Sequence, residues 1–128
     1  MSYSAIVLIP NSMNLDLTKP IRRLQRPECG LQVEWLGPDT LRIADGEWTI
    51  SLSLEQELHV AEESCELIAQ YGAGRADSAT LASAKRRISI YSEEDPNMEH
   101  FNAFALVLEA FQEIPGLGVF DAASEEFL

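Results

Sequence analysis

Two histidines are the side chains whose type and spacing could support metal or acid–base chemistry. His59 lies four residues from both Glu55 and Glu63, so on a helix these three side chains would share one face. An imidazole and two carboxylates can bind a transition metal, but a single histidine among solvated glutamates makes a poor zinc site. We favour a surface histidine in an acidic helix. A small metal-dependent or hydrolytic enzyme using His59 or His100 is the alternative.

His100 follows a short acidic segment that contains Glu93, Glu94, Asp95 and Glu99. A calcium loop would place glycine and alternating carboxylates across about twelve residues, and that pattern is absent. The Asp95-Pro96 pair is typical of a helix start, where the helix dipole favours acidic side chains. Glu93 and Glu94 precede this start, so we expect them to be available to a basic partner.

The sequence contains none of the common catalytic motifs. No glycine-rich phosphate loop follows a strand, and no serine-hydrolase motif or zinc-ligand spacing occurs. We therefore expect a protein that is not an enzyme and that has no catalytic residue, cofactor or metal. Cys65 falls on an expected apolar helix stripe, which predicts a buried packing residue, and we expect Cys65 and Cys29 both to be reduced thiols.

Acidic residues dominate the charge of the chain. The 128 residues include 21 acidic and 9 basic side chains, a net charge of −12. Residues 51–128 hold 15 acidic and 4 basic side chains and so carry −11 of this total. Nucleic acids and anionic membranes attract basic surfaces, so this charge disfavours binding to either. It favours a partner protein with a basic surface, or it serves only solubility.

Hydrophobic periodicity predicts the elements that position these residues. Strands are expected at 3–9, 31–36, 41–44, 48–53, 87–91 and 117–120, and Asp45-Gly46 is a strong hairpin signal. A short helix is expected near 18–25, and a long one should begin at a Ser53-x-x-Gln56 capping box. The apolar stripe of that long helix would be Leu54, Leu58, Ala61, Cys65 and Ile68.

A second long helix is expected after Pro96, and its stripe would include Met98, Phe101, Phe104, Leu108 and Phe111. Residues 103–108 of this helix are apolar almost all round, which indicates cover on more than one side. The same feature makes a structural subunit of a homodimer a further alternative. The helix is long enough for a right-handed crossover, which would allow the strands on either side of it to be parallel.

The element order predicts a single α+β domain over residues 1–128. That order is strand, short helix, three strands, helix, strand, helix, strand. We expect a mostly antiparallel sheet of about five to six strands, with both long helices packed on one face. The apolar run at 5–9 is too short for a secretory signal and has no basic segment before it, so we expect a cytoplasmic protein.

Residues 85–128, with Arg86-Arg87-Ile88-Ser89-Ile90-Tyr91, Glu94-Asp95-Pro96-Asn97 and Pro115-Gly116, resemble a pattern in small uncharacterised bacterial proteins. The whole chain resembles the bacterial immunity proteins made against polymorphic and secretion-system toxins, which are small, acidic, single-domain proteins without catalytic motifs. This resemblance implies a toxin-neutralising partner and assigns no individual residue. The charge pattern, in turn, suggests contacts through Glu62, Glu63, Glu66, Glu93, Glu94, Asp95 and Glu99.

Overall fold

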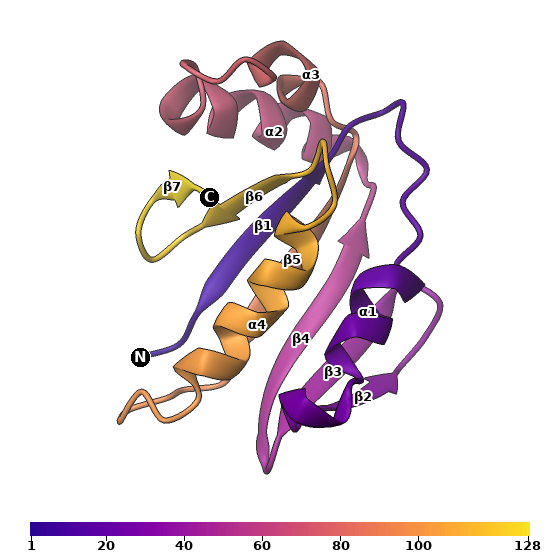
Figure 1. Ribbon diagram of the computed structural model, residues 1–128. Coiled ribbons are helices and arrows are strands. Elements are labelled where there is room, and N and C mark those ends of the chain that lie inside the picture. The colour runs from indigo at the N-terminus through magenta and orange to yellow at the C-terminus, as the bar shows by residue number, and fades with distance from the viewer.

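The computed structural model describes residues 1–128 as one seven-stranded antiparallel sheet with helices on both faces (Figure 1). The strands are β1 (Ser4–Ile9), β2 (Gln32–Trp35), β3 (Thr40–Asp45), β4 (Trp48–Glu55), β5 (Arg86–Ser92), β6 (Gly118–Asp121) and β7 (Glu126–Phe127). The α-helices are α1 (Thr18–Leu24), α2 (Leu58–Tyr71), α3 (Ser78–Ala82) and α4 (Phe101–Gln112), and Pro27–Cys29 forms a 3-10 turn. The strand order is β2-β3-β4-β5-β1-β6-β7. The predicted α+β class and mostly antiparallel sheet are therefore confirmed.

The two long helices lie on opposite faces of the sheet, so the prediction that both pack on one face was wrong. The side chain of Val7 joins the core under α4, whereas the next residue, Leu8, packs with Ile68 of α2 on the other face. Val7, Leu8 and Ile9 are all completely buried. A strand that is apolar on both faces needs cover on both sides, and α2 with α3 provides the second layer.

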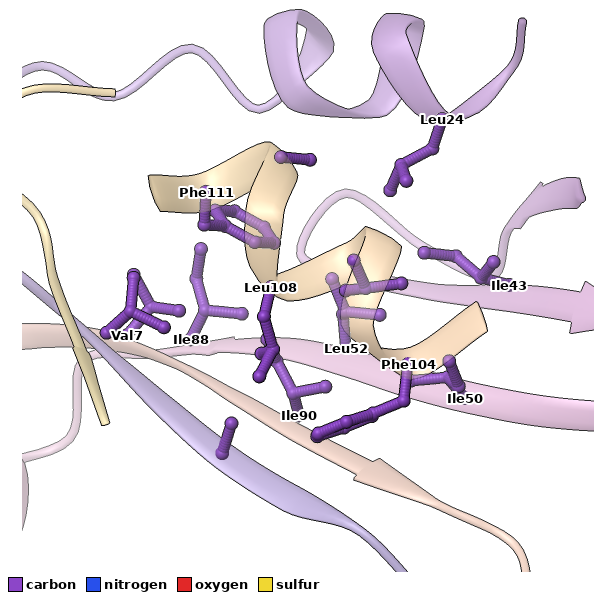
Figure 2. Close-up of a cluster of buried hydrophobic side chains, with 14 of the residues drawn as sticks. Val7, Leu24, Ile43, Ile50, Leu52, Ile88, Ile90, Phe104, Leu108 and Phe111 are labelled. Carbon is purple, nitrogen blue, oxygen red and sulfur yellow. The ribbon is translucent and has the colours of Figure 1, made fainter. Parts of the chain in front are cut away.

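The larger core lies between the sheet, α4 and α1 (Figure 2). Phe104, Leu108 and Phe111 of α4 point toward the sheet, where they meet side chains such as Ile90. Leu24 of α1 approaches the same cluster from the side. The apolar character of α4 on more than one side is thus explained within the chain, because the sheet and α1 both cover it.

The strands on either side of α4 run in the same direction but are not neighbours. Strand β1 lies between β5 and β6 and is antiparallel to both. The helix α4 therefore crosses over one intervening strand, and no parallel pair forms.

Helix α2 begins later than the capping-box motif predicts. Ser53 is still in β4, paired with Thr40 and Ser89, and the strand continues to Glu55. The buried face of α2 consequently contains Val60, Ser64 and Ile68. Ser64 can be buried because its hydroxyl donates a hydrogen bond of 2.8 Å to the carbonyl of Val60.

This shift overturns two predictions about α2. Leu58 is 97% exposed rather than part of the core, and Cys65 is an exposed free thiol rather than a packing residue. Cys29, also a free thiol, is partly buried. No helix of the chain has both the length and the apolar character needed to cross a bilayer.

Candidate binding surface

The seven predicted contact residues fall into two groups at opposite ends of the sheet (Figure 1). Glu62, Glu63 and Glu66 lie on α2, whereas the four residues of the segment 93–99 lie between β5 and α4. The two groups lie at opposite ends of strand β5. Arg87, near the start of β5, contacts Glu63 of the first group, and the last residue of β5 directly precedes the second group. The acidic charge therefore forms two surfaces and not one.

Two of the three α2 carboxylates have no basic partner within the chain. Glu62 and Glu66 are exposed and take part in no ion pair. Glu63 differs, because it accepts a hydrogen bond of 2.9 Å from Arg87 Nη1. The exposed charge of α2 thus comes chiefly from Glu62 and Glu66.

Arg87 is a nearly buried arginine that joins α2 to the sheet. It is 9% exposed, and its Nε donates to Glu55 at 2.8 Å, while Ser89 donates to the same carboxylate oxygen. Burial opposes ionisation of Glu55, but the hydrogen bonds from Ser89 and Arg87 outweigh it and lower the pKa of this carboxyl group. Burial likewise opposes the charge of Arg87, but the bonds to Glu55 and Glu63 raise its pKa. These paired charges have a structural role.

The residues around His59 do not form a metal site. His59 is exposed, and the carboxylates of Glu55 and Glu63 bond to Arg87 instead. No group of three or more His, Cys, Asp or Glu side chains in the chain has the geometry to hold a metal ion. The arrangement that the metal-dependent alternative needs at His59 is therefore not formed.

In the second group, Asp95 is buried and cannot contact a partner. It is only 2% exposed, and it accepts hydrogen bonds from the Tyr3 hydroxyl at 2.7 Å and from the backbone N–H groups of Glu99 and His100 at 3.1 and 3.0 Å. Burial disfavours the ionised form of Asp95, but these hydrogen bonds stabilise that form more strongly and lower the pKa of Asp95. Burial and the bond to Asp95 raise the pKa of Tyr3 to about 12. The inclusion of Asp95 in the acidic surface was therefore wrong.

The other three carboxylates of this group, Glu93, Glu94 and Glu99, are all exposed, but they differ in their hydrogen-bond partners. Glu93 accepts hydrogen bonds from the backbone N–H and the hydroxyl of Thr49 at 3.0 and 2.7 Å. Glu94 accepts one from the amino group of Met1 at 2.7 Å. Glu99 is exposed and has no ion pair. Glu99 is therefore the member of this group whose charge remains most available.

His100 is held in place by a contact that the sequence did not reveal. Its Nδ1 donates to Asp45 Oδ2 at 2.8 Å, and its ring stacks on Trp48. The bond to Asp45 raises the pKa of His100. The imidazole bonds to no hydroxyl or thiol, which a nucleophilic catalytic pair would require. The sequence pattern indicates for Asp45 only a place in the hairpin turn.

A second feature missed from the sequence is a group of exposed apolar side chains beside the start of α4. Met98 is 54% exposed, Phe101 45% and Leu128 43%. The periodicity had placed Met98 and Phe101 on the buried stripe, but Met98 precedes the helix and lies in a turn. The second acidic group thus borders apolar surface.

Comparison with known proteins gives no relative from which a function could be transferred. No protein-family model matches the chain, and no curated protein or solved structure is significantly similar to it. The functional argument therefore depends on the chemistry of the chain's own surface.

Proposed function

We propose that this chain is a binding protein of the immunity type, which neutralises a cognate toxin by docking to it through acidic side chains. The observation that carries the proposal is the presence of exposed carboxylates without a basic partner, among them the predicted contact residues Glu62, Glu66 and Glu99. They belong to a chain with a net charge of −12.

Only three of the nine lysine and arginine side chains form ion pairs with carboxylates of the chain. Arg23 lies 3.3 Å from Glu113, and Arg75 donates to Asp77 at 2.8 Å. Arg87 is shared between two glutamates. Internal neutralisation is thus limited, and the remaining negative potential extends into solvent, where it attracts a basic surface.

This potential favours a basic protein partner over the other charged targets in a cell. A phosphate backbone and an anionic membrane would both be repelled by it. Electrostatic complementarity of this kind acts mainly on the association rate, and salt weakens it because exposed charges are screened over about 10 Å at 0.1 M ionic strength.

The proposal is tested by expressing the open reading frame adjacent to this gene, with and without the chain. We expect the neighbouring product to arrest growth, and we expect co-expression of the chain to restore it by forming a stable complex. Size-exclusion chromatography of the two purified proteins measures that complex directly. A neighbouring product that is harmless, or an arrest that the chain does not relieve, would contradict the proposal.

A further inference from the structure

We propose that the groove between α4 and β6 docks an amphipathic, basic segment of the partner protein. An apolar side chain of that segment would enter the groove, and neighbouring lysine or arginine side chains would meet the carboxylates at its rim. This inference rests on the proposed function, and it selects the α4 end of the molecule, rather than α2, as the centre of the interface.

The size and lining of the groove suit a single anchoring side chain. Its volume is about 160 Å³, whereas pockets for small-molecule ligands usually measure about 300–1,000 Å³. Its apolar lining consists of Phe101, Phe104, Ala105, Leu108 and Leu128. An anchor that fills such a pocket at the centre of an interface commonly carries much of the binding energy.

Exposed apolar side chains gather at this groove. Phe101 and Leu128 line the groove, and Met98 lies three residues before Phe101. On the α2 side, Leu58 is an equally apolar exposed residue, but it does not line this groove. Single exposed apolar residues are ordinary, whereas a contiguous group rimmed by polar residues marks an interaction site.

The backbone turn before α4 is strained at Met98. Met98 has a φ of +55°, in the left-handed region that a non-glycine residue rarely adopts. The turn is held by the buried carboxylate of Asp95, which accepts from the N–H groups of Glu99 and His100. Strain of this kind persists where the surroundings enforce it. Here it leaves the flexible thioether side chain of Met98 54% exposed, three residues before Phe101.

The charges at the rim determine which partner fits. Glu109 and Asp121 line the groove together with Gln112, and no basic side chain does so. Arg23 approaches Glu109 only to 3.9 Å. A second copy of this chain would bring the same carboxylates opposite one another across a symmetric contact, which like charges oppose. An amphipathic basic segment, by contrast, can place an apolar side chain on the apolar floor and its basic side chains against the acidic rim.

A designed peptide provides a direct test. The probe is a helical peptide of about 18 residues made of leucine and lysine, with leucines at i, i+3, i+4 and i+7, and the control peptide has the same composition in scrambled order. Amide chemical shifts locate the bound peptide on the chain, and fluorescence anisotropy of labelled peptide gives its Kd. We expect the shifts to concentrate at the groove and the scrambled peptide to bind more weakly.

Matched variants separate the groove from general acidity. Phe101→Ser removes an apolar wall, and Ala105→Trp fills the groove while keeping it apolar, so the second variant remains informative if the first does not fold. We expect each to weaken binding about tenfold or more. Leu58→Ser is the control for the loss of an exposed apolar residue. The double variant Glu109→Lys and Asp121→Lys tests the rim charges, and the double variant Glu62→Lys and Glu66→Lys is its charge control. We expect the rim variant to weaken peptide binding more than the control does.

Four results would overturn this inference while leaving the proposed function intact. The shifts could lie on α2, both groove variants could bind like the unaltered chain, or the scrambled peptide could bind equally well. A dimer of the chain in sedimentation that Ala105→Trp abolishes would show that a second copy occupies the groove, and this would also overturn it. Failure of the growth-rescue experiment would instead contradict the proposed function.

Discussion

The imidazole of His100 lies flat on the indole of Trp48, with ring centroids 4.8 Å apart and an angle of 6° between the planes. The bond from His100 to Asp45 fixes this stack, so the β3–β4 hairpin is joined to the start of α4. The Trp48 Nε1 donates to the carbonyls of Glu93 and Glu94 at 3.2 and 3.1 Å. The acidic segment before α4 is therefore a fixed part of the fold.

The contribution of His100 to stability should decrease as the pH rises. Because the pKa of His100 is raised in the folded state, its stabilising effect is complete below the ordinary histidine value of about 6.5 and is lost as the pH rises through the raised value. We expect the difference in free energy of unfolding between the unaltered chain and His100→Gln to shrink over that window. Urea unfolding at a series of pH values measures it.

Asp45→Asn provides the matching control for this effect. Without the carboxylate, the pKa of His100 should move back toward its ordinary value, which an NMR titration of the imidazole reports. A His100 titration that is identical in the unaltered chain and in Asp45→Asn would show that this bond does not form in solution.

The contribution of Asp95 to stability should instead decrease as the pH falls. Its pKa is lowered in the fold, so its stabilising effect is present above the ordinary aspartate value of about 3.9 and is lost as the pH falls through the lowered value. We expect Asp95→Asn to be less stable than the unaltered chain at neutral pH and to approach it in acid. Thermal unfolding across the acid range tests this, and a difference that stays constant would count against a buried, charged Asp95.

The position of the buried face of α2 can be measured with two alanine substitutions. Ile68 is 4% exposed in the smaller core, so Ile68→Ala should cost about 2–5 kcal/mol of stability. Leu58 is 97% exposed, so Leu58→Ala should change stability by less than about 0.5 kcal/mol. If denaturant unfolding showed equal losses of stability for the two variants, the result would contradict this buried face and support the apolar stripe predicted from the sequence.

The two cysteines should differ in accessibility. Cys65 is exposed on α2, whereas Cys29 is partly buried and its Sγ lies 3.7 Å from the carbonyl oxygen of Arg23. We expect a thiol reagent to modify Cys65 first in the folded protein, and mass spectrometry of the digested product identifies the labelled residue. Preferential labelling of Cys29 would contradict this placement of α2.

Local sequence signals predicted much of the strand framework. The Asp45-Gly46 hairpin forms between β3 and β4, and Gly46 has the positive φ of 66° that such a turn favours. The alternating pattern likewise located β4 and β5, and the apolar run located β1. These features depend on neighbours within a few residues, which is why periodicity could find them.

The arrangement of the helices and the polar clusters depends on distant residues. Tyr3 and Asp95 are 92 positions apart, and Arg87 is 32 positions from Glu55, so no local pattern links them. The face of α2 was misplaced because Ser64 is polar yet buried, while the apolar Leu58 is exposed. Hydrophobicity alone ranks these two residues in the wrong order.

The most direct measurement of the central claim is the association rate constant of this chain with the protein encoded by the adjacent reading frame, followed by stopped flow as the ionic strength increases. We expect the rate to fall with salt, because exposed carboxylates steer a basic partner. Replacing Glu62, Glu66 and Glu99 with lysine should slow association at low salt and flatten its salt dependence. An association rate that neither salt nor these substitutions change would contradict docking through the acidic surface.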